Sequence, residues 1–128
     1  MSSVLVVDDD LKLLKAVQIR LESLGYDVMI AQDAYYALAT SVRAHPDLIV
    51  LDVNLPAGNG FGIEHRLHEI ESLRDTPIIY ITGESPEAIK EHVRHSGARK
   101  VLHKPFKAEE LVAAVIEAIG VSAPQPTK

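Results

Sequence analysis

Short apolar runs alternate along the chain with segments in which apolar residues recur every three or four positions. The runs are continuous and rich in valine and isoleucine, as in strands of a parallel sheet that is covered on both faces. They predict five strands, at Val4–Val7, Val28–Ala31, Leu48–Leu51, Ile78–Ile81 and Val101–Leu102.

The segments between these runs have the periodicity of amphipathic helices. Asp10 and Ser85 stand where N-cap residues are expected, and Gly25 and Gly120 are placed to end helices. The expected helices are Leu11–Leu24, Ala34–Ala44, a segment from the Gly58–Gly60 turn to about Leu73, a segment from Pro86 to near Gly97, and Ala108–Ile119.

Five strand–helix units in succession predict one α/β domain, a doubly wound parallel sheet with right-handed crossovers. A chain of 128 residues is long enough for a single domain with its own core. We expect that domain to span residues 1–120. The remaining residues, 121–128, contain two prolines and no helical pattern, which indicates either a flexible tail or the start of a linker.

Composition excludes several classes of protein. The net charge of −5 argues against direct contact with nucleic acid, because phosphate binding needs a basic surface. The absence of cysteine excludes disulfide and thiolate chemistry. No apolar run reaches the length of a membrane span, and the N-terminus has no signal-peptide pattern, so a soluble cytoplasmic protein without membrane contact is expected.

Three aspartates, Asp8, Asp9 and Asp10, follow the first apolar run. Carboxylates packed together repel, and the pKa of at least one should rise unless a cation neutralises them. Asp10 is better explained as the cap of the following helix. The pattern therefore predicts a bound metal at the end of the first strand.

Ligands of open α/β sheets bind beyond the carboxyl ends of the strands. The later predicted strands are followed by Asp52 and then Asn54, by Thr82 and Gly83, and by His103 and Lys104. Carboxylates, a hydroxyl and an ammonium group should therefore meet at one edge. Such an oxygen-rich site suits Mg²⁺, and a carboxylate can attack phosphorus to form an aspartyl phosphate. Phosphoryl transfer then depends mainly on positioning and charge neutralisation.

At these residues the chain resembles the receiver domain of bacterial two-component response regulators. The resemblance covers about residues 3 to 120 and implies a flavodoxin-like fold with strand order 2-1-3-4-5. It rests on four segments in the family's order and spacing: VLVVDDD (Val4–Asp10), LDVNLPAGNG (Leu51–Gly60), ITG (Ile81–Gly83) and KPF (Lys104–Phe106).

The resemblance implies a role for each acidic residue. Asp52 would be the phosphoacceptor, taking the phosphoryl group from a phosphohistidine. Asp9 would bind Mg²⁺ directly, Asp8 would help through a water, and Asn54 would offer its backbone carbonyl to the metal. Mn²⁺ is the alternative ion.

Three further residues carry roles implied by the family. Lys104 would pair with a phosphoryl oxygen and precede a cis peptide bond to Pro105. Thr82 would move to hydrogen-bond the phosphoryl group, and the small Gly83 would leave the phosphorus accessible.

The implied function is a phosphoryl-accepting signalling domain that phosphorylates itself from a donor and dephosphorylates slowly, rather than an enzyme. Its donor would be a histidine kinase or a histidine phosphotransfer protein, and its output partner is not identifiable from the sequence. A monomer or a phosphorylation-dependent dimer is expected, and the chain is either a stand-alone receiver or part of a longer protein.

One residue departs from the family pattern. Receivers often carry Tyr or Phe three residues before the lysine of the last strand, and here that switch position is Val101. Valine is too short and stiff to swing inward as an aromatic side chain does. We expect Thr82 to shift and the neighbouring surface to reorder without an aromatic rotamer change.

Three other functions remain to be separated from this one. A haloacid-dehalogenase-type phosphatase also forms an aspartyl phosphate but wants a second acid where Asn54 stands. A flavin- or nucleotide-binding domain would need a loop rich in Gly, Ser or Thr after the first strand. A degenerate receiver would bind partners without phosphorylation, which the complete acidic set argues against.

Three pairs of side chains lie outside this pattern. Histidines three apart on helices, at 65 and 68 and at 92 and 95, resemble zinc ligands, but solvated helix faces are favoured because neither pair has a visible second ligand pair. Tyr35 and Tyr36 are expected to divide between core and surface rather than to form a partner surface.

Overall fold

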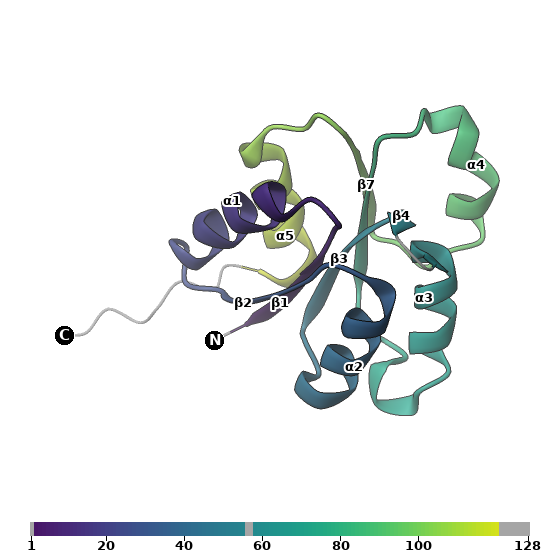
Figure 1. Cartoon of the computed structure of the whole chain (residues 1–128), viewed down its shortest axis with the longest axis horizontal. Coiled ribbons are helices and arrows are strands. Elements are labelled where there is room, and N and C mark those ends of the chain that lie inside the picture. Colours follow the sequence, from purple (N-terminus) through teal and green to yellow (C-terminus); the bar gives the residue numbers. More distant parts are fainter. Residues whose placement is uncertain (1, 56–57, 121–128) are drawn as a thin grey trace.

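The computed structural model describes residues 2–55 and 58–120 and shows a five-stranded parallel sheet between two layers of helices (Figure 1). The sheet has the order β2-β1-β3-β6-β7, which is the predicted 2-1-3-4-5 order of the five main strands. These strands are β1 (Ser3–Val7), β2 (Asp27–Ala31), β3 (Leu48–Asp52), β6 (Ile78–Thr82) and β7 (Lys100–His103). Each lies within one or two residues of its predicted bounds.

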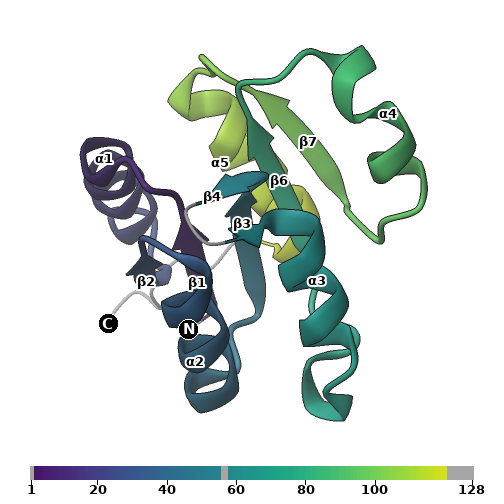
Figure 2. The ribbon, with the colours of Figure 1, turned by 45° about the vertical axis from the view of Figure 1, so that its right-hand side comes forward.

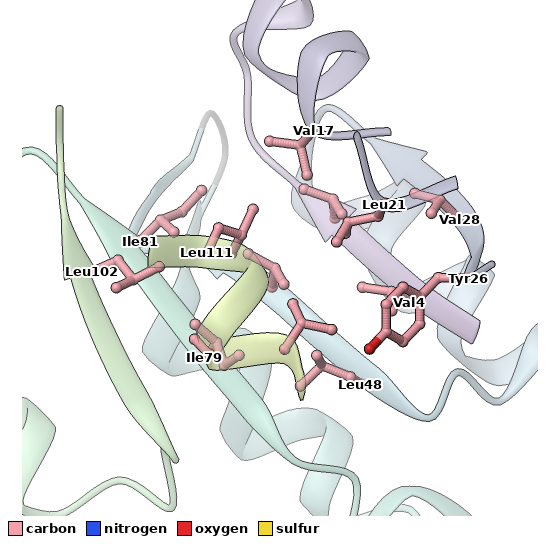
Figure 3. Close-up of a cluster of buried hydrophobic side chains, with 14 of the residues drawn as sticks. Val4, Val17, Leu21, Tyr26, Val28, Leu48, Ile79, Ile81, Leu102 and Leu111 are labelled. Atoms are coloured by element: carbon pink, nitrogen blue, oxygen red, sulfur yellow. The ribbon is translucent and has the colours of Figure 1, made fainter. Parts of the chain in front are cut away.

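The helices cover both faces of the sheet. Helices α1 (Leu11–Glu22) and α5 (Ala108–Ile119) lie on one face, and α2 (Ala34–Ala44), α3 (Gly60–His68) and α4 (Pro86–Arg94) lie on the other (Figures 1 and 2). The buried side chains form two apolar clusters, one on each face. Figure 3 shows the α1/α5 cluster, in which Val17 and Leu21 from α1 and Leu111 from α5 pack over Val4, Ile79 and Ile81 of the sheet.

The predicted helix starts are confirmed by their caps. Asp10 Oδ1 accepts hydrogen bonds from the backbone N–H groups of Lys12 and Leu13, at 3.0 and 3.3 Å. Ser85 Oγ accepts from the N–H of Ala88 at 3.2 Å. These oxygens satisfy N–H groups that a helix leaves without intrahelical partners, so they fix where α1 and α4 begin.

Four segments differ from the prediction. Helix α1 ends at Glu22 rather than Leu24, and α4 ends at Arg94, before Gly97. Helix α3 ends at His68 because Ile70 adopts an extended backbone, and a separate 3-10 turn, η1 (Glu71–Leu73), then buries Leu73. A two-stranded antiparallel pair of β4 (Asn54–Leu55) and β5 (Gly58–Asn59) lies where only a turn was considered.

The prediction for the two tyrosines of α2 was wrong. Tyr35 and Tyr36 are both exposed, 79% and 62% respectively, and touch each other edge to face. The buried face of α2 is made of the smaller Ala37, Thr40 and Ser41, and both tyrosines lie outside it.

No helix within the described residues combines the length and the apolar character that a membrane span requires. The predicted tail, residues 121–128, lies outside the described residues.

Candidate functional site

The strand register places the two acidic segments side by side. Strands β1 and β3 are parallel neighbours in which Val7 pairs with Leu51, so Asp8 leaves β1 at the level of Asp52 in β3. Strand β6 runs beside β3 on its other side, and its last residue, Thr82, pairs with His103 of β7. The carboxyl ends of these four strands thus form one edge, as expected for a ligand site in this fold class.

Three carboxylates meet at this edge. Asp8, Asp9 and Asp52 each place one carboxylate oxygen within 4.8 Å of the other two. Asp8 is fully buried and Asp52 nearly so, whereas Asp9 is exposed. Oxygen donors this close are suited to a hard divalent cation that keeps several waters, and the exposed side is the one on which those waters would be accommodated.

Lys104 is the cation that holds this cluster in the structure. Its Nζ lies 2.8 Å from Asp8 Oδ2 and donates to Asp52 Oδ2 at 3.3 Å. Its backbone N–H donates to the carbonyl of Thr82 at 2.7 Å, and the bond to Pro105 is cis, as predicted. The lysine therefore contacts both buried carboxylates while remaining partly exposed.

The remaining oxygens of the two buried carboxylates accept backbone N–H groups. Asp8 Oδ1 accepts from Asp10 at 2.9 Å, and Asp52 Oδ1 accepts from Asn54 at 3.1 Å. These bonds fix the direction of each carboxylate before any ligand arrives.

Burial raises the pKa of Asp52 above its ordinary value. The backbone N–H of Asn54 opposes that rise, the charge of Asp8 adds to it, and Lys104 lowers it again. The net upward direction means that the ionised carboxylate is not fully compensated by the protein alone.

The pKa of Lys104 is also raised. Burial works against this, but the hydrogen bond to Asp8 and the negative charges of Asp52 and Asp8 outweigh it. Lys104 therefore remains a cation throughout the physiological range.

Thr82 lies at the same edge and is fully buried. Its Oγ1 accepts the backbone N–H of Glu84 at 2.9 Å, while the Glu84 side chain accepts from Asn54 Nδ2 at 2.7 Å. The backbone carbonyl of Glu84 is 3.0 Å from His103 Nδ1. Sequence reasoning did not select Glu84, although its position directly after Thr82 and Gly83 was the available signal.

Val101 lies away from the carboxylates. It occupies β7 directly beside Tyr80 of β6, and both belong to the apolar cluster beneath α3 and α4. Tyr80 is fully buried, so an aromatic ring stands on the strand next to the position where receivers often carry one.

Gly60, the first residue of α3, packs against the backbone that carries Asp52. A Cβ at this position would lie 2.7 Å from the carbonyl oxygen of Asp52 and 3.1 Å from the ring of Tyr80. Only glycine permits this approach, so α3 begins in contact with the backbone of Asp52.

The structure thus brings together Asp8, Asp9, Asp52 and Lys104, with Thr82 and Asn54 at the margin and Val101 outside. A buried, oriented carboxylate beside a cation and two further carboxylates has the donor set for metal-assisted attack on phosphorus.

Comparison with known protein families gives one match over most of the chain. The model of the response regulator receiver domain matches residues 4–116.

Comparison with individual proteins agrees. The chain is 39% identical over 115 residues to the DNA-binding dual master transcriptional regulator RpaA of Synechocystis, covering 90% of this chain and 48% of that protein. The chain therefore spans about half the length of the regulators it matches at this level.

Two solved structures have the same fold. The chemotaxis protein CheY4 of Vibrio cholerae has a TM-score of 0.87 at 33% identity, with 93% of this chain and 99% of that chain covered. The receiver domain of the sensor histidine kinase PA1611 of Pseudomonas aeruginosa, solved with magnesium in its active-site cleft, has a TM-score of 0.84 at 29% identity, with 92% and 97% covered.

Proposed function

The chain belongs to the response regulator receiver domain family, a family of phosphoryl-accepting signalling domains rather than classical enzymes, and on that premise we propose that Asp52 is its phosphoacceptor. In the proposed reaction a carboxylate oxygen of Asp52 attacks the phosphorus of a phosphohistidine. The P–N bond breaks, the electron pair returns to the imidazole, and an aspartyl phosphate forms.

The observation that carries this proposal is the clustering of three carboxylates around one lysine. Asp8 and Asp52 are both buried and share Lys104, while Asp9 adds a third carboxylate from the exposed side. A purely structural ion pair would need one acid for one lysine, and the surplus negative charge favours a divalent cation.

We assign the metal ligands as the family resemblance implies. Asp9 and Asp52 would bind Mg²⁺ directly together with the backbone carbonyl of Asn54, and Mn²⁺ would be accepted in its place. Asp8 would act through a water, because Lys104 Nζ lies closer to Asp8, at 2.8 Å, than to Asp52, at 3.3 Å. Bound Mg²⁺ would neutralise charge so that an anionic carboxylate can accept another anion.

Two positive or polar groups of the chain would then contact the phosphoryl group. Lys104 would exchange its bond with Asp52 for one with a phosphoryl oxygen. Thr82 would give up the N–H of Glu84 and donate its hydroxyl to the phosphoryl group, which would shift the segment leading to α4. Its neighbour Gly83 has no heavy atom within 4 Å of a Cβ built on it, which supports an open approach to the phosphorus.

The switch would work without an aromatic side chain at Val101. The buried ring of Tyr80 lies beside Val101 on the neighbouring strand, which supports a switch that does not depend on an inward swing at Val101. The proposed signal is a shift of Thr82 passed to α4 and β7 through the backbone.

Family membership implies a histidine kinase as the partner that supplies the phosphoryl group. A histidine phosphotransfer protein as donor, an output partner or domain recognised by the phosphorylated form, and a cytoplasmic location complete the proposal. DNA binding belongs to the named function of RpaA, and for this chain it would require an output segment other than the receiver.

A phosphorylation assay with variants of Lys104 tests the proposed chemistry. The protein is incubated with acetyl phosphate in Mg²⁺ or in EDTA, and the rate of phosphoryl incorporation is followed by intact mass. We expect incorporation only with Mg²⁺, and a rate about a hundredfold lower in Lys104→Ala, because one preorganised cation is lost. Lys107→Ala, which removes an exposed lysine three residues away, is the control and should retain the rate.

Two outcomes would contradict the proposal. Equal rates in Lys104→Ala and Lys107→Ala would remove Lys104 from the reaction. Binding of a flavin or nucleotide without Mg²⁺, and without incorporation, would favour the alternative class of α/β domain.

A further inference from the structure

The two histidine pairs of the sequence meet in one pocket. A cavity of about 540 Å³ between α3 and α4 is lined by His65 and His68 from α3, by His92 from α4 and by His95, the C-cap residue of α4. Sequence reasoning set these pairs aside because neither had a second ligand pair, and the fold supplies one across the pocket. Figures 1 and 2 show the two helices on the same side of the sheet, away from α1.

His68, which lines this pocket, has one ring nitrogen without a hydrogen-bond partner among the described residues. Its Nδ1 lies 3.7 Å from Glu64 Oε2, and its Nε2 is buried with no hydrogen-bond partner among the described residues. An acceptor beside Nδ1 favours the tautomer with the proton on Nδ1, which leaves a lone pair on Nε2.

His95, the C-cap residue of α4, also has one ring nitrogen held by the protein. Its Nδ1 lies 2.9 Å from the backbone carbonyl of Glu91, the kind of partner that metal-binding histidines use to orient their rings. Its Nε2 is then the nitrogen available to a ligand.

The ends of the two helices are already in contact beside these residues. The N–H of Gly97, two residues after His95, donates to Glu64 Oε2 at 2.7 Å. A Cβ at Gly97 would lie 3.9 Å from His68 Cε1. The segment that follows α4 therefore lies directly against α3 beside His68.

The pocket also carries negative charge. Glu64 is buried, accepts hydrogen bonds from the Tyr80 hydroxyl and the Gly97 N–H, and has no Lys or Arg partner among the described ion pairs. Glu91 also lines the pocket, where its side chain pairs with Arg94 at 3.1 Å. A divalent ion bound by neutral imidazoles would offset the buried charge of Glu64.

We propose that this pocket binds a transition metal ion of the zinc class, with His68 and His95 as anchoring ligands through Nε2 and His65 and His92 completing a four-imidazole site. Imidazole nitrogens prefer Zn²⁺ and its neighbours in the first transition row to Mg²⁺, so this site differs in chemistry from the aspartate cluster.

Closure of the site requires side-chain rotation. Within the part of the chain that the structure describes, only the aspartates bring three possible ligand atoms within 4.8 Å of one another. His65, whose side chain is 78% exposed, would leave Glu69, and His92 would leave its stack on Phe61. Surface rotamer changes of this kind are small beside the free energy of zinc coordination.

A zinc titration of the untagged, metal-stripped chain tests the site. Zn²⁺ is added in competition with a chromophoric chelator, in saturating Mg²⁺ so that the aspartate cluster is occupied. We expect one equivalent to bind, with at least a tenfold loss of affinity in His68→Ala and in His95→Ala. His45→Ala, which removes a histidine bonded to Ser72 in a different pocket, should bind as the parent does.

A second measurement on the parent chain guards against variants that fold poorly. Co²⁺ in the presence of Mg²⁺ should give the intense visible bands of tetrahedral nitrogen coordination, and Zn²⁺ should abolish them. The proposal is overturned if no equivalent binds under Mg²⁺, if Co²⁺ shows only the weak bands of octahedral coordination, or if His68→Ala and His95→Ala bind as His45→Ala does. Phosphorylation at the aspartate cluster is not needed for any of these outcomes.

Discussion

Ionising Asp52 costs more free energy in the folded protein than in the unfolded chain. Burial and the neighbouring Asp8 raise its pKa, and the bond to Lys104 only partly offsets them. The native state therefore binds a proton at Asp52 more tightly than the unfolded state does. The resulting loss of stability is absent below the ordinary pKa of 3.8 and complete once the pH exceeds the raised native value.

Because ionised Asp52 destabilises the folded state, we predict that Asp52→Asn stabilises the metal-free protein. At neutral pH and in EDTA we expect the free energy of unfolding to rise by about 1 kcal/mol, because the amide carries no charge to desolvate. Urea denaturation of the parent and the variant, monitored by circular dichroism, measures the two free energies of unfolding. Mg²⁺ should stabilise the parent and not the variant, and a variant less stable than the parent in EDTA would show that the Asp52–Lys104 pair dominates instead.

Two glycines near the site should respond differently to a methyl group. Gly60→Ala places a Cβ 2.7 Å from the Asp52 carbonyl, so we expect a loss of about 1–3 kcal/mol in stability. Gly83→Ala meets nothing within 4 Å and is the matched control, with unchanged thermal unfolding. Equal unfolding temperatures for both variants would mean that α3 is not closely packed against the backbone of Asp52.

At the scale of secondary-structure elements, Tyr80 links strand β6 to helices α3 and α4. Its hydroxyl donates to Glu64 of α3, and its ring contacts Phe61, which in turn stacks on His92 of α4. Burial and the Glu64 bond raise the pKa of Tyr80 far above its ordinary range, so the hydroxyl stays protonated and remains a donor. Strand β6, which carries Thr82, is therefore connected to both α3 and α4.

Removal of this hydroxyl tests the link. Tyr80→Phe leaves one oxygen of the buried Glu64 without its donor, and we expect stability to fall by about 1–3 kcal/mol. Tyr35→Phe removes a hydroxyl from an exposed ring and should change stability by less than about 0.5 kcal/mol. Chemical denaturation of the two variants side by side decides the matter, and similar values for both would show that the Tyr80–Glu64 bond adds nothing.

The proposed switch is also a property of elements rather than of one residue. Phosphorylation should shift the backbone amide signals of residues 82 to 106, which include α4 and β7. The Tyr80 side chain should keep the same rotamer. Amide spectra of the free and phosphorylated protein, recorded in Mg²⁺, measure this. Identical amide spectra over that range would rule out the proposed transmission.

At the scale of the whole molecule, local sequence patterns predicted most of the fold. Continuous apolar runs placed all five main strands, and the caps at Asp10 and Ser85 placed the starts of α1 and α4. The break at Ile70 was not predictable, because it serves the burial of Leu73 against distant elements. Strand order came from the family resemblance and not from periodicity.

The site was predictable to a similar degree. Residues that directly follow strands could be selected because parallel strands end at one edge. The contact of Lys104 with two carboxylates, the bridge from Asn54 to Glu84 and the facing histidine pairs depend on side-chain geometry across the fold. Such contacts join residues that are distant in the sequence, so no local sequence pattern predicts them.

The central claim is that Asp52 accepts a phosphoryl group, and intact mass measurement after incubation with acetyl phosphate and Mg²⁺ tests it most directly. We predict one labile phosphoryl adduct on the parent chain and on Asp10→Asn, since asparagine also caps a helix and Asp10 is not a proposed ligand. Asp52→Asn should carry none. An adduct of equal yield on Asp52→Asn, or an unchanged mass of the parent chain under all conditions, would contradict the claim.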